Sequence, residues 1–155
     1  MQLIENLCFS NHLELINDLI SKYDNILLFS GWLDVEGVEL ISGSLVRAMA
    51  RGASISVISN KEHTDKKSIK LFKNLKIKHA IINASNKVKY FHTKFYYFDG
   101  NGEYAYIIGS PNITKGGLVS NEELSVCISG LTNDTNHKKI QAYIEHIRYT
   151  YLEPS

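Results

Sequence analysis

The sequence lacks the features that mark several protein classes. No apolar run reaches the roughly eighteen residues that a membrane-spanning helix needs. Cys8 and Cys127 are the only cysteines, too few for a disulfide framework or a zinc cluster. The first residues do not show a basic segment followed by an apolar one, as a secretory signal would. From these absences we expect a reduced, cytoplasmic setting and no association with a membrane.

The composition is that of a folded globular domain. Hydrophobic residues make up 44% of the 155 residues and charged residues 21%, which argues against a disordered chain. A chain of this length is the size of one ordinary domain. We therefore expect a single domain spanning residues 1–155.

Positive charge is concentrated in one segment. The net charge is +1, but Lys61–Lys94 contains ten lysines and two acids, a net charge of +8, so the remainder carries −7. Segregated positive charge is typical of proteins that bind a polyanion such as nucleic acid. The alternative interpretation is a lysine-rich helix face exposed to solvent. On charge alone, a solvent-exposed helix face is favoured over a nucleic-acid-binding surface.

Apolar residues alternate between helical and strand-like spacing along the chain. Helical spacing predicts a helix capped by Ser10 or Asn11, a second that stops at Gly52, a third capped by Thr64, and a C-terminal helix. Strands are predicted at residues 26–29, 55–58, 77–82, 89–98, 104–108 and 124–128. Strands separated by helices, with one late hairpin, indicate an α/β sandwich with a mixed sheet.

Two short polar motifs flank the predicted hairpin. His92 and Lys94 share one strand face because successive side chains alternate, and Ser110 and Asn112 share a face if the chain stays extended. Opposed residues of an antiparallel pair lie on the same side, so the four side chains meet only if even positions pair with even. A three-residue loop at 100–102 gives that register and places His92 opposite Ser110. We therefore predict this loop rather than a two-residue one.

Such a cluster suits phosphoryl transfer. An imidazole can attack phosphorus or move a proton near neutral pH, and a lysine ammonium suits phosphate oxygens. Ser110 and Asn112 can donate hydrogen bonds to the same oxygens, which stabilises a pentacoordinate transition state. Glu123 can accept the second ring N–H of His92, with Glu122 as the adjacent alternative. Taken singly, each residue has an ordinary structural interpretation; their order and spacing together favour a site.

The same residues resemble the motif of the phospholipase D superfamily. That motif runs H-x-K, then an aspartate, then G-S-x-N, and in many small nucleases N-x-E follows; HTK at 92–94, GSPN at 109–112 and NEE at 121–123 match it in order. The resemblance extends over residues 26–128 and implies an αβαβα sandwich. The segment between Asp99 and the second motif is longer than usual, so we interpret Asp99 as a turn residue and leave it out of the catalytic candidates.

The resemblance also implies a mechanism. The family uses two histidines, one attacking phosphorus and one protonating the leaving oxygen, whereas this chain carries one H-x-K. It therefore implies a homodimer whose site lies on the two-fold axis, a phosphohistidine intermediate on one His92, and the other His92 as general acid. No cofactor and no metal is implied.

The favoured substrate is DNA, cleaved by a metal-independent endonuclease. Domains of this kind resemble the catalytic part of restriction endonucleases and helicase-associated defence proteins, which implies that a separate domain would read the DNA sequence. A phospholipid hydrolase or transphosphatidylase is the second interpretation, although its relatives usually carry two motifs in a longer chain. A non-catalytic nucleic-acid-binding or assembly module with the same fold is the third.

Overall fold

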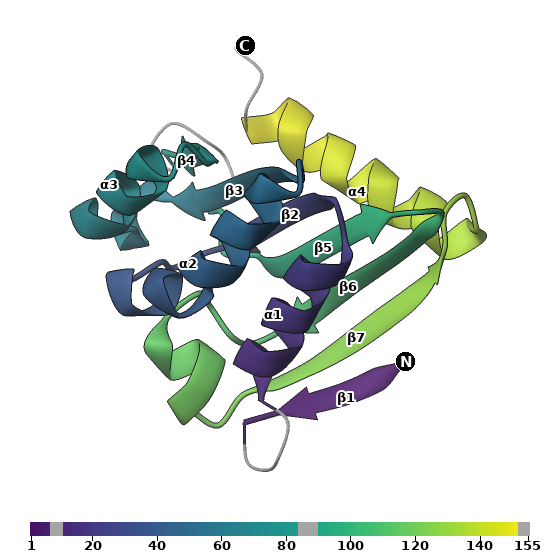
Figure 1. Cartoon of the computed structure of the whole chain (residues 1–155), viewed down its shortest axis with the longest axis horizontal. Coiled ribbons are helices and arrows are strands. Elements are labelled where there is room, and N and C mark those ends of the chain that lie inside the picture. Colours follow the sequence, from purple (N-terminus) through teal and green to yellow (C-terminus); the bar gives the residue numbers. More distant parts are fainter. Residues whose placement is uncertain (7–10, 84–89, 152–155) are drawn as a thin grey trace.

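A computed structural model of the chain describes residues 1–6, 11–83 and 90–151, and its central feature is a seven-stranded mixed sheet (Figure 1). The strand order is β1-β7-β6-β5-β2-β3-β4, in which β2, β3 and β4 run parallel and the remaining pairs are antiparallel. The strands are β1 (Gln2–Glu5), β2 (Asn25–Ser30), β3 (Ser54–Asn60), β4 (Lys78–Ile82), β5 (Lys94–Gly100), β6 (Glu103–Gly109) and β7 (Leu124–Leu131).

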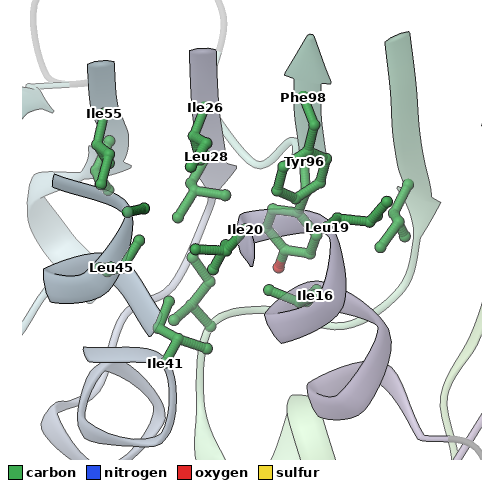
Figure 2. Close-up of a cluster of buried hydrophobic side chains, with 14 of the residues drawn as sticks. Ile16, Leu19, Ile20, Ile26, Leu28, Ile41, Leu45, Ile55, Tyr96 and Phe98 are labelled. Atoms are coloured by element: carbon green, nitrogen blue, oxygen red, sulfur yellow. The ribbon is translucent and has the colours of Figure 1, made fainter. Parts of the chain in front are cut away.

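Helices cover both faces of this sheet, which confirms the predicted α/β sandwich. They are α1 (His12–Lys22), α2 (Val35–Ala50), α3 (Lys66–Asn74) and α4 (Thr135–Tyr151), with short helical turns η1 (Lys61–His63) and η3 (Gly116–Ser120). The first three pack on one face, where the core takes side chains from α1 and α2 together with β2 and β5 (Figure 2). Helix α4 packs on the other face, where Ile144 and Ile147 meet an aromatic-rich cluster.

Local signals set most of the helix ends as predicted. The Asn11 side chain accepts the Glu14 N–H at 2.9 Å and so caps α1. Gly52 ends α2 with a φ of 92°, the left-handed conformation that glycine adopts without strain. The predicted cap of α3 is wrong by one residue: Asp65, not Thr64, accepts the Ser68 N–H. Strand β1 was not predicted, and Cys8 and Lys89 lie outside the described residues.

The hairpin between β5 and β6 has a two-residue loop, so the predicted three-residue loop is wrong. Gly100 pairs with Glu103, which leaves Asn101 and Gly102 at the turn with φ values of 54° and 81°. Two positive φ values are those of a type I′ turn, whose twist matches that of the flanking strands. Even positions of β5 therefore pair with odd positions of β6, and the pleat alone does not gather the four polar side chains.

The polar motifs nevertheless reach one edge of the sheet. Strands β2 and β3 end there, β5 begins there, β6 ends there and β7 begins there, because each antiparallel neighbour reverses direction (Figure 1). His92 precedes β5, whereas Ser110 and Asn112 follow β6, so these residues lie beyond the regular pleat and its alternation of faces. In the described part of the chain, no helix combines the length and apolarity that a membrane span requires.

Candidate active site

His92 and Lys94 form the centre of the site. The Lys94 Nζ lies 2.7 Å from Nδ1 of His92 and 3.1 Å from Nε2, and it donates to the His92 carbonyl oxygen at 3.1 Å. The His92 side chain is exposed, so a substrate can reach the imidazole. The two residues that the sequence placed on one face are thus in contact, next to solvent.

Burial and nearby charge favour the neutral form of the His92 imidazole. Partial burial lowers the pKa of His92, and the positive charges of Lys94 and His63 lower it further. Burial also lowers the pKa of Lys94, and the negative charge of Glu123 opposes that effect. A neutral imidazole has a free lone pair, which is what a nucleophile needs.

Gly31 brings the end of β2 against His92. A Cβ built on Gly31 would lie 3.0 Å from both Cα and Cδ2 of His92, closer than side-chain contacts normally allow. Because glycine has no Cβ, the backbone of β2 can approach the imidazole and fix its position. Sequence reasoning did not identify Gly31 as a site residue.

Ser110 and Glu123 form a second part of the site. The Ser110 hydroxyl donates to Oε2 of Glu123, and it accepts the Leu124 N–H at 3.1 Å. Glu122 is exposed and makes no hydrogen bond in the described part of the chain, so Glu123 is the carboxylate that enters the site. The predicted hydrogen bond from His92 to Glu123 does not form among the described residues, because the carboxylate is engaged by Ser110 instead.

Asn112 is held beside the end of β2 by its neighbours. Its Oδ1 accepts the Trp32 N–H at 2.9 Å, which leaves its amide NH₂ as the donor group. The Tyr96 hydroxyl, buried in the core, donates to the Pro111 carbonyl at 2.7 Å and so supports the same loop from below. A Cβ on Gly117 would lie 2.4 Å from the Asn112 carbonyl oxygen, so only glycine permits this packing.

Asp99 lies away from this cluster and is not a turn residue. It is in β5 opposite Asn25 and Tyr104, near the hairpin end of the strand, while Lys94 begins the same strand at the site edge. Its Oδ2 accepts the Tyr97 hydroxyl at 2.7 Å. The interpretation of Asp99 as a turn residue is therefore wrong, because Asp99 pairs with Tyr104 within the strand, one position before the Gly100–Glu103 pair that closes the hairpin.

Besides Gly31, two further features of the site were missed by sequence reasoning. Asn60 is fully buried; its Nδ2 donates to the Phe91 carbonyl at 3.0 Å, and its Oδ1 accepts the Glu62 N–H at 2.9 Å, which ties the segment before His92 to the end of β3. Trp32 is half exposed beside Asn112. Neither residue belongs to a motif, and only the tertiary fold brings them to His92.

No group of three or more His, Cys, Asp or Glu side chains that could hold a metal ion occurs within the described ranges. The site therefore consists of one imidazole, one ammonium, an amide, and a hydroxyl paired with a carboxylate.

Comparisons with solved structures agree on the fold. Nuc, a phospholipase D family member from Salmonella typhimurium, superposes with a TM-score of 0.70 at 22% identity, over 96% of this chain and 91% of that one. NucT from Helicobacter pylori gives 0.70 at 16% identity, over 97% and 96%. A yeast tyrosyl-DNA phosphodiesterase gives 0.55 at 18% identity, over 95% of this chain and 37% of its own.

Comparison of the sequence with protein families agrees with the likeness in fold. No curated protein matches the chain. The family model described as "Cardiolipin synthase, PLD-like domain" matches residues 16–148, which is most of the chain and includes every candidate site residue. The mixed sheet, the order of the motifs and this match lead to one conclusion: the chain belongs to the phospholipase D-like family.

Proposed function

We propose that this protein is a metal-independent phosphodiesterase that cleaves DNA as an endonuclease. The observation that carries the proposal is the exposed His92 imidazole with Lys94 Nζ at 2.7 Å and a pKa lowered by burial and by that charge. A neutral nucleophile next to a fixed cation is suited to attack a phosphodiester, whose own negative charge repels anionic nucleophiles.

The reaction runs in two steps. A ring nitrogen of His92 forms a bond to phosphorus, the P–O bond to the leaving group breaks, and the partner's His92 gives that oxygen a proton. Water then attacks the phosphohistidine while the partner's His92 takes its proton, and the P–N bond breaks to restore the imidazole. Lys94 and the Asn112 amide stabilise the charge that develops on the phosphoryl oxygens.

The second imidazole comes from another copy of the chain. Among the described histidines, His12 and His137 are buried, and neither these two nor His63, His79 and His146 belong to a second H-x-K motif. A two-fold dimer places two His92 side chains at one phosphorus, since a closed two-fold interface duplicates every residue. Wild-type protein mixed with excess His92→Ala tests this arrangement. After subunit exchange, activity should fall as the square of the wild-type fraction; a linear fall would contradict the shared site.

An uncovered apolar patch supports the dimer. Ile108 and Leu124 are 47% and 55% exposed, and they lie on neighbouring strands on the face opposite α1 and α2, next to Ser110. Burying such side chains against a second copy is favourable. Leu124→Glu should give a monomer without activity. Leu131→Glu, at the opposite end of β7 and 66% exposed, is the matched control and should keep the dimer mass.

A substrate comparison tests the activity itself. Plasmid DNA and phosphatidylcholine are each incubated with the protein in EDTA, with His92→Ala as the control. We expect DNA cleavage that persists in EDTA and disappears in the variant. Hydrolysis of phosphatidylcholine without cleavage of DNA would favour a phospholipid enzyme. Equal activity of the wild-type protein and His92→Ala would favour a non-catalytic module.

As part of the same proposal, this domain is the catalytic part of a restriction or defence enzyme. Cleavage by the domain alone should then be largely independent of sequence, because its site contacts would go to phosphate oxygens, which carry no sequence information. A fixed pattern of cut sites in a random-sequence library would contradict this part of the proposal.

A further inference from the structure

A row of aromatic rings leads away from His92. The Tyr90 ring lies 6.1 Å from the His92 ring, the His63 ring lies 6.1 Å from that of Tyr90, and the Trp32 ring stacks on His63 at 5.2 Å with an interplanar angle of 30°. These are centroid distances at which aromatic rings attract one another. Three segments distant in sequence thus supply one continuous set of rings.

The row is open to solvent. Trp32 is 50% exposed and Tyr90 is 47% exposed, although aromatic side chains of this size are mostly buried elsewhere in the described chain. Exposing so much ring surface costs free energy that burial would recover. The exposure is also local: of the large exposed aromatic side chains in the described ranges, only Tyr149 lies outside the row.

The backbone holds these rings in place before any ligand binds. The Trp32 N–H donates to Asn112 Oδ1 at 2.9 Å, and the next residue, the buried Leu33, donates its N–H to the His63 carbonyl at 2.9 Å. The buried Asn60 joins the start of η1 to the Phe91 carbonyl, next to Tyr90. Rings that are already positioned lose little conformational entropy when a ligand stacks on them.

The segment that carries most of the row is rich in lysine, with one carboxylate close by: desolvation and the nearby Glu62 carboxylate raise the pKa of Tyr90. His63 and Tyr90 belong to the segment Lys61–Lys94, whose net charge is +8. Within the described residues, no lysine of α3 comes within ion-pair distance of a carboxylate. Flat aromatic surfaces combined with unpaired positive charge are how proteins bind single strands: bases stack on the rings and cations follow the phosphates.

We propose that Trp32, His63 and Tyr90 form a platform on which an unpaired nucleobase stacks while its neighbouring phosphate reaches His92. This inference rests on the proposed nuclease function and narrows it to single-stranded substrate. In a duplex the faces of the bases are covered by their neighbours, and a base must be unstacked before it can meet the rings. A single strand presents its bases without that cost.

Fluorescence tests the stacking directly, because Trp32 is the only tryptophan in the chain. His92→Ala protein is titrated with oligothymidine and with an abasic oligonucleotide of the same length, and a dye on each reports binding by anisotropy. Oligothymidine should quench Trp32, and the abasic strand should bind about 5- to 150-fold more weakly without quenching. Equal affinities, or binding of oligothymidine without quenching, would overturn the platform.

Cleavage provides the second readout. Trp32→Ala should lower the ratio of single-strand to duplex cleavage, Trp32→Phe should retain it because a ring remains, and Tyr149→Ala, a change at the exposed aromatic on α4, should leave it unchanged. A ratio unaffected by Trp32→Ala would overturn the inference and leave the nuclease proposal intact. Quenching by oligothymidine with a wild-type protein that cleaves no nucleic acid would instead remove the nuclease proposal and keep the platform as a binding site.

Discussion

The Lys94 ammonium lies against the His92 imidazole, with Nζ 2.7 Å from Nδ1. A cation so close disfavours a second positive charge on the ring, which adds to the effect of burial on the pKa of His92. One lysine therefore has two functions. In the proposed reaction it lowers the pKa of the attacking imidazole, and it stabilises the phosphoryl oxygens during attack.

Replacing this lysine should change both functions. Lys94→Ala should lower the rate by roughly 10²–10³, the effect of losing one strong transition-state donor. It should also move the acidic limb of the pH–rate profile upward, because the pKa of His92 rises when the charge is removed. Profiles of kcat/KM measured against pH check this, with Lys138→Ala on α4 as a control that should match wild type. An unmoved acidic limb would contradict the electrostatic role.

Gly31 should prove intolerant of substitution. An added Cβ would press on the Cα and Cδ2 atoms of His92, so Gly31→Ala should displace the imidazole and lower kcat by about 10². Gly43→Ala is the matched control, because its Cβ would meet only the flexible end of Arg47, at 3.4 Å. Steady-state kinetics and thermal unfolding are measured together. A Gly31→Ala protein that unfolds like wild type and retains full kcat would rule out the positioning role.

Glu123 should affect turnover more than binding. The carboxylate accepts the Ser110 hydroxyl and opposes the lowering of the Lys94 pKa by burial, and Glu123→Gln removes the charge while keeping a similar shape. We expect a rate about tenfold lower or more, with substrate affinity largely unchanged. Glu122→Gln, at the exposed neighbouring position, should match wild type. If both variants lose the same activity, general surface charge explains the effect and not the Ser110 contact.

Stability should fall in acid because of His79. Its Nε2 lies 2.8 Å from the Ser59 hydroxyl oxygen, its ring packs on Phe72, and burial lowers its pKa from 6.5 to about 4. The unfolded chain takes up a proton near pH 6.5 and the folded chain only near 4, so protonation favours unfolding across that window.

The free energy of unfolding should therefore drop by about 3 kcal/mol between pH 6.5 and pH 4 through this group alone. Urea denaturation at a series of pH values measures the slope. His79→Gln should flatten it, whereas the exposed His146→Gln should not. An unchanged slope in the His79 variant would assign the acid sensitivity to other groups.

The elements of the fold were predictable because their signals are local. Helix α1 shows both an apolar stripe and a cap at Asn11, and β2 is a short apolar run buried on both faces. Strand β1 was missed because it is short and its one buried residue, Ile4, does not stand out from its neighbours. The candidate site residues could be chosen from the sequence for a similar reason, because each motif is contiguous.

The assembly of the site was not predictable from those signals. The assumption that strand alternation gathers His92 and Ser110 required a loop of odd length, but Asn101 and Gly102 make a tighter turn. The residues reach one edge of the sheet because the chain leaves the pleat at the ends of β5 and β6. The contacts of Gly31, Asn60 and Trp32 depend on segments that the fold brings together, which no local pattern records.

The tight turn at Asn101 and Gly102 has a practical consequence. It lies at the end of the β5–β6 hairpin opposite the chemistry, both residues are exposed, and a Cβ on Gly102 would meet no atom within 4 Å. Loop tips of this kind tolerate added chain. A fluorophore, an affinity peptide or a whole fused protein attached there would leave the edge that carries the candidate site open, so the turn is a suitable attachment point for immobilising or retargeting this domain.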